Sequence, residues 1–133
     1  MRQMSVISAV FDSRFFPVQM EEMIDLMVEI SVLNSFEPIS DPLDWDIEIH
    51  GLTLSILEND QIYQSTYLPG VALEGGLTKA VTLDHLVRKA GYDGNFEDVA
   101  DIVEIWRYQS VKFGMDYYDW ENPHSGWRTC YYK

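Results

Sequence analysis

The chain has 133 residues, of which 47% are hydrophobic and 14% aromatic, so it is predicted to form one globular domain rather than a disordered segment. Twenty-two acidic residues against nine lysines and arginines give a net charge of −13 at pH 7. Nucleic acids and anionic membranes bind proteins through Lys and Arg. This balance therefore argues against both as the main partner.

Cys130 is the only cysteine, which excludes an intramolecular disulfide and favours a reducing compartment. The first twenty residues lack the basic and apolar regions of a signal peptide, and no uncharged apolar run approaches the roughly 18 residues of a membrane span. We expect a cytoplasmic or nuclear protein.

The N-terminal segments predict two helices and a strand. In "MSVISAVFD" the apolar residues share one helical stripe, which ends at the turn "DSRFFP". After Pro17, a second stripe follows helical spacing and is made of Met20, Met23, Ile24 and Met27. We expect this stripe to pack in a core; a pliable binding surface is the alternative. The alternation in "MVEISVL" then predicts a half-buried strand.

The middle of the chain predicts a hairpin after an irregular linker. The linker is "NSFEPISDPLDW", with two prolines. In "DIEIHGLTLSIL" the apolar positions shift phase at Gly51, which predicts a strand interrupted by a bulge or tight turn. "ENDQ" then predicts the hairpin connection to "IYQSTYL".

The stretch "TYLPGVALEGG", residues 66–76, predicts a shaped turn between sheet and helix, in which Gly75 and Gly76 permit special backbone angles. Thr78 is a candidate N-cap of the following helix, and Gly91 marks its end. "YDGNFEDVAD" predicts a loop that could include a helical turn, and "IVEIWRYQSVKF" predicts the last strong strand.

Five segments together resemble the AMMECR1 domain in its eukaryotic form: "DSRFFP", "EISVLNSFEPI", "LDWDIEIHGL", "STYLPGVALEGGLTKAVTLDHLVRKAGYDG" and "RYQSVKF". They run from about Ser5 to about Trp120. The resemblance implies an α+β fold in which helices pack an antiparallel sheet, as in the C-terminal, larger part of that domain. We therefore expect a domain over residues 1–120 and an aromatic tail over residues 121–133. The resemblance also implies association with partner proteins.

The sequence departs from the family pattern in two places. The family motif Leu-Arg-Gly-Cys-Ile-Gly, which lies upstream of the matched segments, is absent, so we expect a domain truncated at its N-terminus. In the loop, Gly70, Gly75 and Leu77 stand where Glu, Gln and Trp are usual. The loop would thereby lose an acidic acceptor and an aromatic wall.

Candidate site residues come from the first turn, the loop and the helix after it. Arg14 could bind an anion or a partner carboxylate; a local ion pair with Asp12 is the alternative. Arg14 and His50 are the catalytic candidates. The predicted binding residues are Asp12, Ser13, Arg14, Tyr67, Leu68, Pro69, Glu74 and Arg88.

Other polar groups give weaker indications. Asp44, Asp46 and Glu48 would lie on one side of an extended segment, either as acid–base or cation-binding groups or as a solvated face. The histidines and Cys130 show no ligand spacing, which argues against zinc, and nothing in the sequence places Cys130 beside a base. No cofactor is indicated.

Two functions remain after these observations. The first is an intracellular protein-interaction module that offers the 66–76 loop and the aromatic tail to partners. The second is an enzyme, or an enzyme subunit, whose site is completed by a missing N-terminal segment or by another chain. If the upstream half is absent, the tail or a second copy of the chain, as a homodimer, would cover the face it leaves. A third interpretation is that these residues are a partial gene model of a longer protein.

Overall fold

The architecture comes from a computed structural model, and the structure describes residues 2–122 and 128–130. The chain divides into two units. The terminal unit combines Met1–Ser31 with Lys112–Lys133, and the central unit is Val32–Val111. Two long strands, β1 and β4, each contribute residues to both units.

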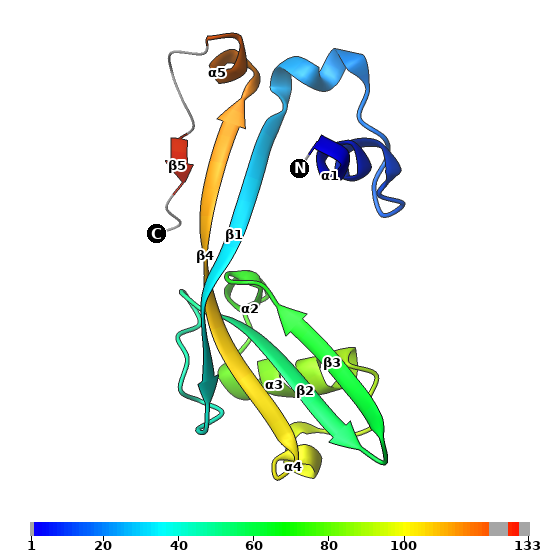
Figure 1. Cartoon of the computed structure of the whole chain (residues 1–133), viewed down its shortest axis with the longest axis vertical. Helices are drawn as coiled ribbons and strands as arrows, with labels where there is room; N and C mark the ends of the chain where they lie inside the picture. Colours follow the sequence, from blue (N-terminus) through cyan, green and yellow to red (C-terminus); the bar gives the residue numbers. More distant parts are fainter. Residues whose placement is uncertain (1, 123–127, 131–133) are drawn as a thin grey trace. The chain divides into compact units, whose positions relative to one another are not determined.

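Helical segments and strands follow one another in runs along the chain, three helical segments first, then three strands, then three more helices (Figure 1). The helical segments are α1 Arg2–Val6, the π-helix η1 Ile7–Phe11, the 3-10 helix η2 Met20–Asp25, α2 Val71–Glu74, α3 Lys79–Lys89, α4 Phe96–Val99 and α5 Tyr117–Glu121. The strands are β1 Met27–Ile39, β2 Gly51–Glu58, β3 Gln61–Tyr67, β4 Val103–Asp116 and β5 Arg128–Cys130.

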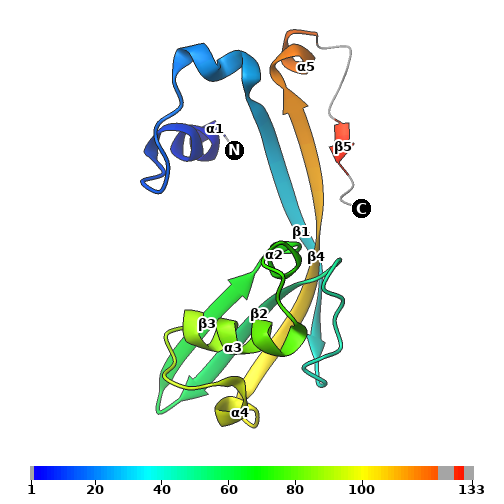
Figure 2. The ribbon, with the colours of Figure 1, turned by 180° about the vertical axis from the view of Figure 1, so that it is seen from behind.

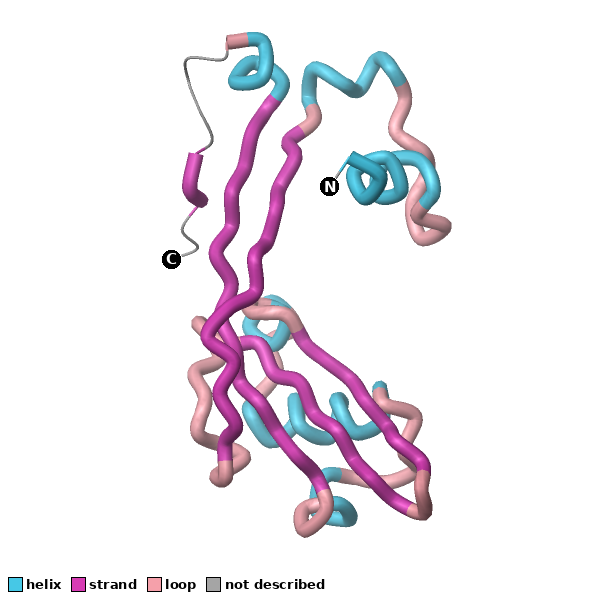
Figure 3. Tube along the Cα trace, in the orientation of Figure 1, coloured by secondary structure: helices cyan, strands magenta, loops and turns pink. Residues whose placement is uncertain are grey.

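The strands form one sheet in the order β1-β4-β2-β3, with β5 also paired to β4 (Figure 3). Strand β2 runs antiparallel to both β3 and β4, and β4 runs antiparallel to β5. The predicted α+β fold with an antiparallel sheet packed by helices is therefore confirmed.

The β2–β3 hairpin is built as its sequence predicts. Asn59 and Asp60 connect the strands with φ of 51° and 61°, and left-handed angles at both positions are typical of the tight turn that matches strand twist. The register pairs Leu52 with Tyr67 at one end and Glu58 with Gln61 at the other. The alternate residues of β2 that face inward, Leu52, Leu54 and Ile56, are all buried.

Helix α3 covers this buried face of the central unit, and Figure 2 shows it lying across β2 and β3. Thr78 is its N-cap, since the threonine hydroxyl accepts a bond from Val81 N. The helix buries Leu83, Leu86 and Val87 in the core. Burying one such side chain is worth about 1.5–3 kcal/mol, so this face largely stabilises the unit.

Tyr108 of β4 contacts β1 and the end of β3. Its ring stacks on Phe36 with centroids 4.8 Å apart. Its hydroxyl lies 2.9 Å from Thr66 Oγ1 and donates to the carbonyl of Tyr67 at 3.0 Å. Burial raises the pKa of this phenol, although the bond with Thr66 opposes the shift. The hydroxyl is thus a neutral donor that fixes the end of β3.

Strand β1 differs from its prediction, because it continues through the first half of the segment expected to be irregular and ends only at Ile39. The sequence suggested a break because of Pro38, but β1 stands at one end of the strand order, where a missing N–H costs little. Ser35 adopts φ of 53°, so the strand is locally irregular. Most of β1 is exposed, and the prediction of a half-buried strand was wrong.

The segment before Gly51 also differs from its prediction. Ile47 and Ile49 were expected to begin a strand, but residues 47–49 form a turn and β2 starts at Gly51. The turn is closed by the backbone N–H of His50, which donates to Asp46 O at 2.8 Å. The phase shift in the sequence therefore marks the boundary between a turn and a strand.

Candidate functional site

The 66–76 loop is a strand end, a turn and a single helical turn in the central unit. Gly70, with φ of 90°, precedes α2, and Gly76, with φ of 61°, follows it. Gly75 has an ordinary helical conformation instead. The predicted shaped turn is confirmed, but its special angles fall at Gly70 and Gly76.

The strand end of this loop is tied to the rest of the unit. Lys89 Nζ lies 4.8 Å from the ring centroid of Tyr67 and donates to Thr66 O at 2.7 Å. Leu68 and Glu74 are exposed, whereas Pro69 is partly covered. A binding role for Tyr67, Leu68, Pro69 and Glu74 stays a prediction.

Arg88 belongs to a different set of contacts. It lies in the last turn of α3, and its Nη2 donates to Asn95 Oδ1 at 2.6 Å. Asn95 is the N-cap of α4. This arginine therefore links two helices, and its predicted binding role stays a prediction.

The Asp12–Arg14 pair lies in the turn after η1, in the terminal unit. Arg14 Nη2 lies 2.6 Å from Asp12 Oδ2, and Arg14 Nε donates to Asp12 Oδ1 at 2.9 Å. These bonds hold the pKa of the Asp12 carboxyl down at about 2. The local ion pair, the alternative given above, is thus present, with Ser13 exposed between its partners. Anion binding by Arg14 stays a prediction.

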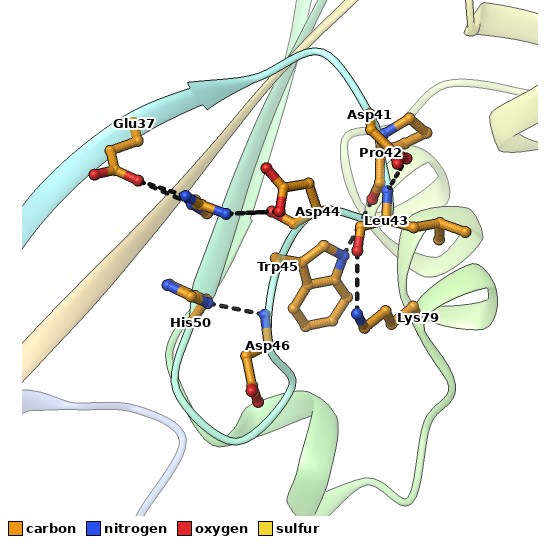
Figure 4. Close-up of polar contacts among 10 residues, drawn as sticks. Glu37, Asp41, Pro42, Leu43, Asp44, Trp45, Asp46, His50 and Lys79 are labelled. Atoms are coloured by element: carbon orange, nitrogen blue, oxygen red, sulfur yellow. Dashed lines mark hydrogen bonds and ion pairs between the residues drawn. The ribbon is translucent and has the colours of Figure 1, made fainter.

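Arg107 of β4 holds two of the carboxylates that Figure 4 labels, Glu37 and Asp44. Its Nε and Nη2 donate to Glu37 Oε2 at 2.9 and 2.8 Å. Its Nη1 contacts both the Asp44 carbonyl, at 2.8 Å, and the Asp44 carboxylate, at 3.0 Å. The bond with Glu37 is the main cause that raises the pKa of this guanidinium. One cation therefore holds two carboxylates and a carbonyl.

The three carboxylates predicted to share one side of a strand are separated by the turn. Asp44 contacts Arg107, while Asp46 Oδ1 accepts a bond from the backbone N–H of Glu48 at 2.9 Å. The prediction that these carboxylates lie on one side of an extended segment was wrong, because residues 47–49 form a turn. All three residues are exposed.

His50 also serves this turn. Its Nδ1 accepts a hydrogen bond from Asp46 N at 2.8 Å, as Figure 4 shows. The imidazole and the His50 backbone thus bind the same residue from two sides. His50 is a positioning residue of the turn, and a catalytic role for it stays a prediction.

Trp45 and Lys79 complete the same segment. The Trp45 ring is buried, and its Nε1 donates to Pro42 O at 3.1 Å. Lys79 Nζ donates to Leu43 O at 3.0 Å and lies 5.8 Å from the Trp45 ring centroid (Figure 4). These contacts hold residues 42–45 against α3, so the segment is a packed part of the central unit.

The terminal unit contains an apolar groove of about 300 Å³. The groove is lined by Met23, Leu26, Val28, Met115, Asp116, Tyr117 and Trp120. These residues come from η2 and its C-cap Leu26, the start of β1, the end of β4 and α5. Apart from one carboxylate, every lining side chain is hydrophobic or aromatic, which is the composition of sites that bind apolar groups.

The methionine stripe of the terminal unit is exposed rather than packed in a core. Met20 is 77% exposed, Ile24 52% and Met27 65%, while Met23 lies in the wall of the groove. The prediction of a core was wrong, because periodicity shows that a segment has an apolar face but not what covers it. The other interpretation, a pliable surface, agrees with the groove.

Sequence reasoning did not identify Leu26, Met115, Tyr117, Trp120 or Arg107 as site residues. The abundance of Tyr and Trp from residue 117 onward was a signal for two of them, Tyr117 and Trp120. Much of the predicted tail, including His124, Trp127 and the side chain of Cys130, lies outside the described residues. That the tail covers a face of the domain stays a prediction.

The described part of the chain has neither a metal-binding cluster nor a membrane-spanning helix. Within residues 2–122 and 128–130, no cluster of three or more His, Cys, Asp or Glu residues could hold a metal ion. None of the helices described there is long and apolar enough to span a membrane.

Known proteins resemble this chain over most of its length. The sequence model of the AMMECR1 family matches residues 1–113. An uncharacterised protein of Schizosaccharomyces pombe is 40% identical over 110 residues, which cover 83% of this chain and 56% of the relative. One from Arabidopsis thaliana is 40% identical over 116 residues, which cover 85% of this chain and 54% of the relative.

A solved structure extends the comparison to the fold. The crystal structure of the uncharacterised protein PH0010 from Pyrococcus horikoshii superposes with a TM-score of 0.69 at 27% identity, over 96% of this chain and 61% of that protein. The chain spans about half the length of the curated relatives it matches. On the family match, the aligned relatives and the shared fold, this chain belongs to the AMMECR1 family.

Proposed function

We propose that this AMMECR1-family chain is an intracellular protein-interaction module, in the cytoplasm or the nucleus, and that the apolar groove of the terminal unit is its docking surface for a protein partner. One observation carries the proposal: a groove of about 300 Å³ is lined almost wholly by apolar side chains. Exposed apolar patches of this kind in a folded chain typically mark interaction sites.

The burial of the terminal unit supports this proposal. Every buried hydrophobic residue of the described chain lies in the central unit. In the terminal unit, large side chains such as Phe16, Met20 and Trp120 are 97%, 77% and 65% exposed. Leaving such side chains in water forgoes about 1.5–3 kcal/mol each, so a partner that covered several of them would gain substantial free energy.

The groove residues are of the kinds that interfaces use. Trp and Tyr, here Trp120 and Tyr117, are enriched at the energetic centres of interfaces. Met23 and Met115 are unbranched and polarisable, so they adapt to different partner side chains.

Site-specific photo-crosslinking tests the proposal. We would replace Tyr118, which is 64% exposed on α5, with p-benzoylphenylalanine and irradiate cells that contain the full chain. Ile62 of the central unit, 63% exposed, is the matched control position. We expect a discrete adduct with a different protein at position 118 and none at position 62, and we expect Leu26→Asp to abolish it.

Three results would contradict the proposal. They are equal adducts at both positions, no adduct at position 118, and an adduct only with a second copy of the chain. The last result would identify a homodimer interface instead.

A further inference from the structure

Several carboxylates of the two helices beside the groove are held by local hydrogen bonds. In η2, Gln19 and Glu22 form a capping box, in which Glu22 Oε2 accepts from the Gln19 backbone N–H at 2.7 Å. At α5, the N-cap Asp116 accepts from Asp119 N at 2.7 Å, and Glu121 accepts from the Tyr117 hydroxyl at 2.8 Å. Carboxylates therefore shape both helical walls.

The two walls carry charge of one sign only. The η2 sequence is MEEMID and the α5 sequence is YYDWE, and neither includes Lys, Arg or His. Glu21, Glu22 and Asp25 are exposed on η2, Glu121 is exposed on α5, and Asp116 lines the groove itself. An occupant of this apolar groove would therefore meet the Asp116 carboxylate, and both helices that contribute to the groove carry acidic residues only.

From this arrangement, and resting on the proposed function, we infer that the partner presents a basic amphipathic segment, with apolar side chains in the groove and Lys or Arg against these carboxylates. Opposite charges across an interface select the partner and raise the association rate. A helix with apolar anchors on one face is the usual ligand of a hydrophobic groove that contains methionine.

Charge also argues against the other occupants. A second copy of this chain carries the same net charge of −13, so two acidic walls would face each other. An anionic phospholipid surface would be repelled for the same reason. A volume of about 300 Å³ is at the lower end of the range for ligand pockets, about 300–1,000 Å³, so it suits a few anchoring side chains.

Designed peptides test the inference with the full chain. The probe is a fluorescein-labelled Leu/Lys peptide of about 18 residues with apolar positions at helical spacing. Its controls are a scrambled peptide of the same composition and two matched peptides with Gln or Glu in place of Lys. Affinity would be measured by fluorescence anisotropy at about 0.05 M and about 0.5 M salt, since salt screens exposed charges.

We expect the amphipathic Leu/Lys peptide to bind about tenfold or more tightly than the scrambled, Gln and Glu peptides at low salt, and to lose most of that advantage at high salt. Trp120→Ala and Met23→Ala should each weaken binding about tenfold, because they remove groove contacts. The double variant Glu21→Gln, Asp25→Asn should weaken it about threefold and flatten the salt dependence. Leu57→Ala, at an exposed site of the central unit, is the control and should change nothing.

Two outcomes would overturn the inference separately from the proposed function. If the Gln peptide bound as tightly as the Lys peptide, and still depended on Trp120, the groove would dock peptides without selecting for charge. If no peptide bound while position 118 still crosslinked to a partner, the partner would not be a basic amphipathic segment. Loss of both peptide binding and crosslinking would overturn the inference and the proposed function together.

Discussion

Leu86 and Leu26 are the same residue type in the two units, but their surroundings differ. Leu86 of α3 is completely buried between the helix and the sheet of the central unit. Leu26 is partly exposed in the wall of the terminal groove. The comparison shows that an apolar pattern stabilises a unit only when the fold supplies an opposing surface. The central unit supplies one from its own residues, whereas the terminal unit leaves a surface to be covered.

The largest expected effect tests this comparison directly. Leu86→Ala should lower the free energy of unfolding by about 2–5 kcal/mol, because it leaves a cavity in a packed core. Leu26→Ala should cost less than about 1 kcal/mol, because water already reaches the site. Urea denaturation of both variants checks the difference. An equal loss would show that the terminal unit has a core of its own.

A smaller effect is expected at the boundary between turn and strand. A Cβ on Gly51 would lie 2.7 Å from each of Pro69 Cδ, Tyr108 Cζ and the Tyr67 carbonyl. Gly51→Ala should therefore cost about 1–3 kcal/mol through overpacking, as measured by urea denaturation. Leu57→Ala, on the same strand but 62% exposed, is the control. A Gly51→Ala protein as stable as the parent would show that the central unit packs more loosely here than its distances indicate.

The smallest effect belongs to the terminal unit and concerns pH. The folded-state pKa of Asp12 is about 2, below its usual value of 3.8, so its pairing with Arg14 stabilises the fold above about pH 4 and is lost as the pH falls toward 2. Arg14→Ala should return the pKa of Asp12 toward 3.8, as carboxyl NMR titration would show. Because the pair is exposed, global stability should hardly change. A parent protein in which Asp12 titrates near 3.8 would contradict the pairing.

The parts of the fold that could be predicted from the sequence depend on local signals. Thr78 caps its own helix, and Asn59 with Asp60 closes its own hairpin, so a few neighbouring residues specify each. The inward positions of β2 could be predicted because alternation reports one buried face. These signals lie mainly in the central unit.

Features that depend on distant partners could not be predicted. Arg107 contacts Glu37 and Asp44, which are 70 and 63 residues away, and nothing in the local sequence of β4 indicates this. The methionine stripe has helical spacing, as predicted, but its side chains are exposed and not packed in a core. The groove joins η2 to α5, two short helices near opposite ends of the chain, so it exists only once the chain has folded.

Strand β1 has a further consequence for how the chain behaves at high concentration. A long exposed strand at the side of a sheet is the usual starting point for aggregation, because another chain can continue its hydrogen bonding. Here Pro38 removes one donor, and the left-handed φ of 53° at Ser35 makes the strand locally irregular. Glu29 and Glu37 add charge, which Lys112 and Arg107 hold in place. These features discourage copies of the chain from stacking strand on strand, so the strand can remain open without promoting fibres.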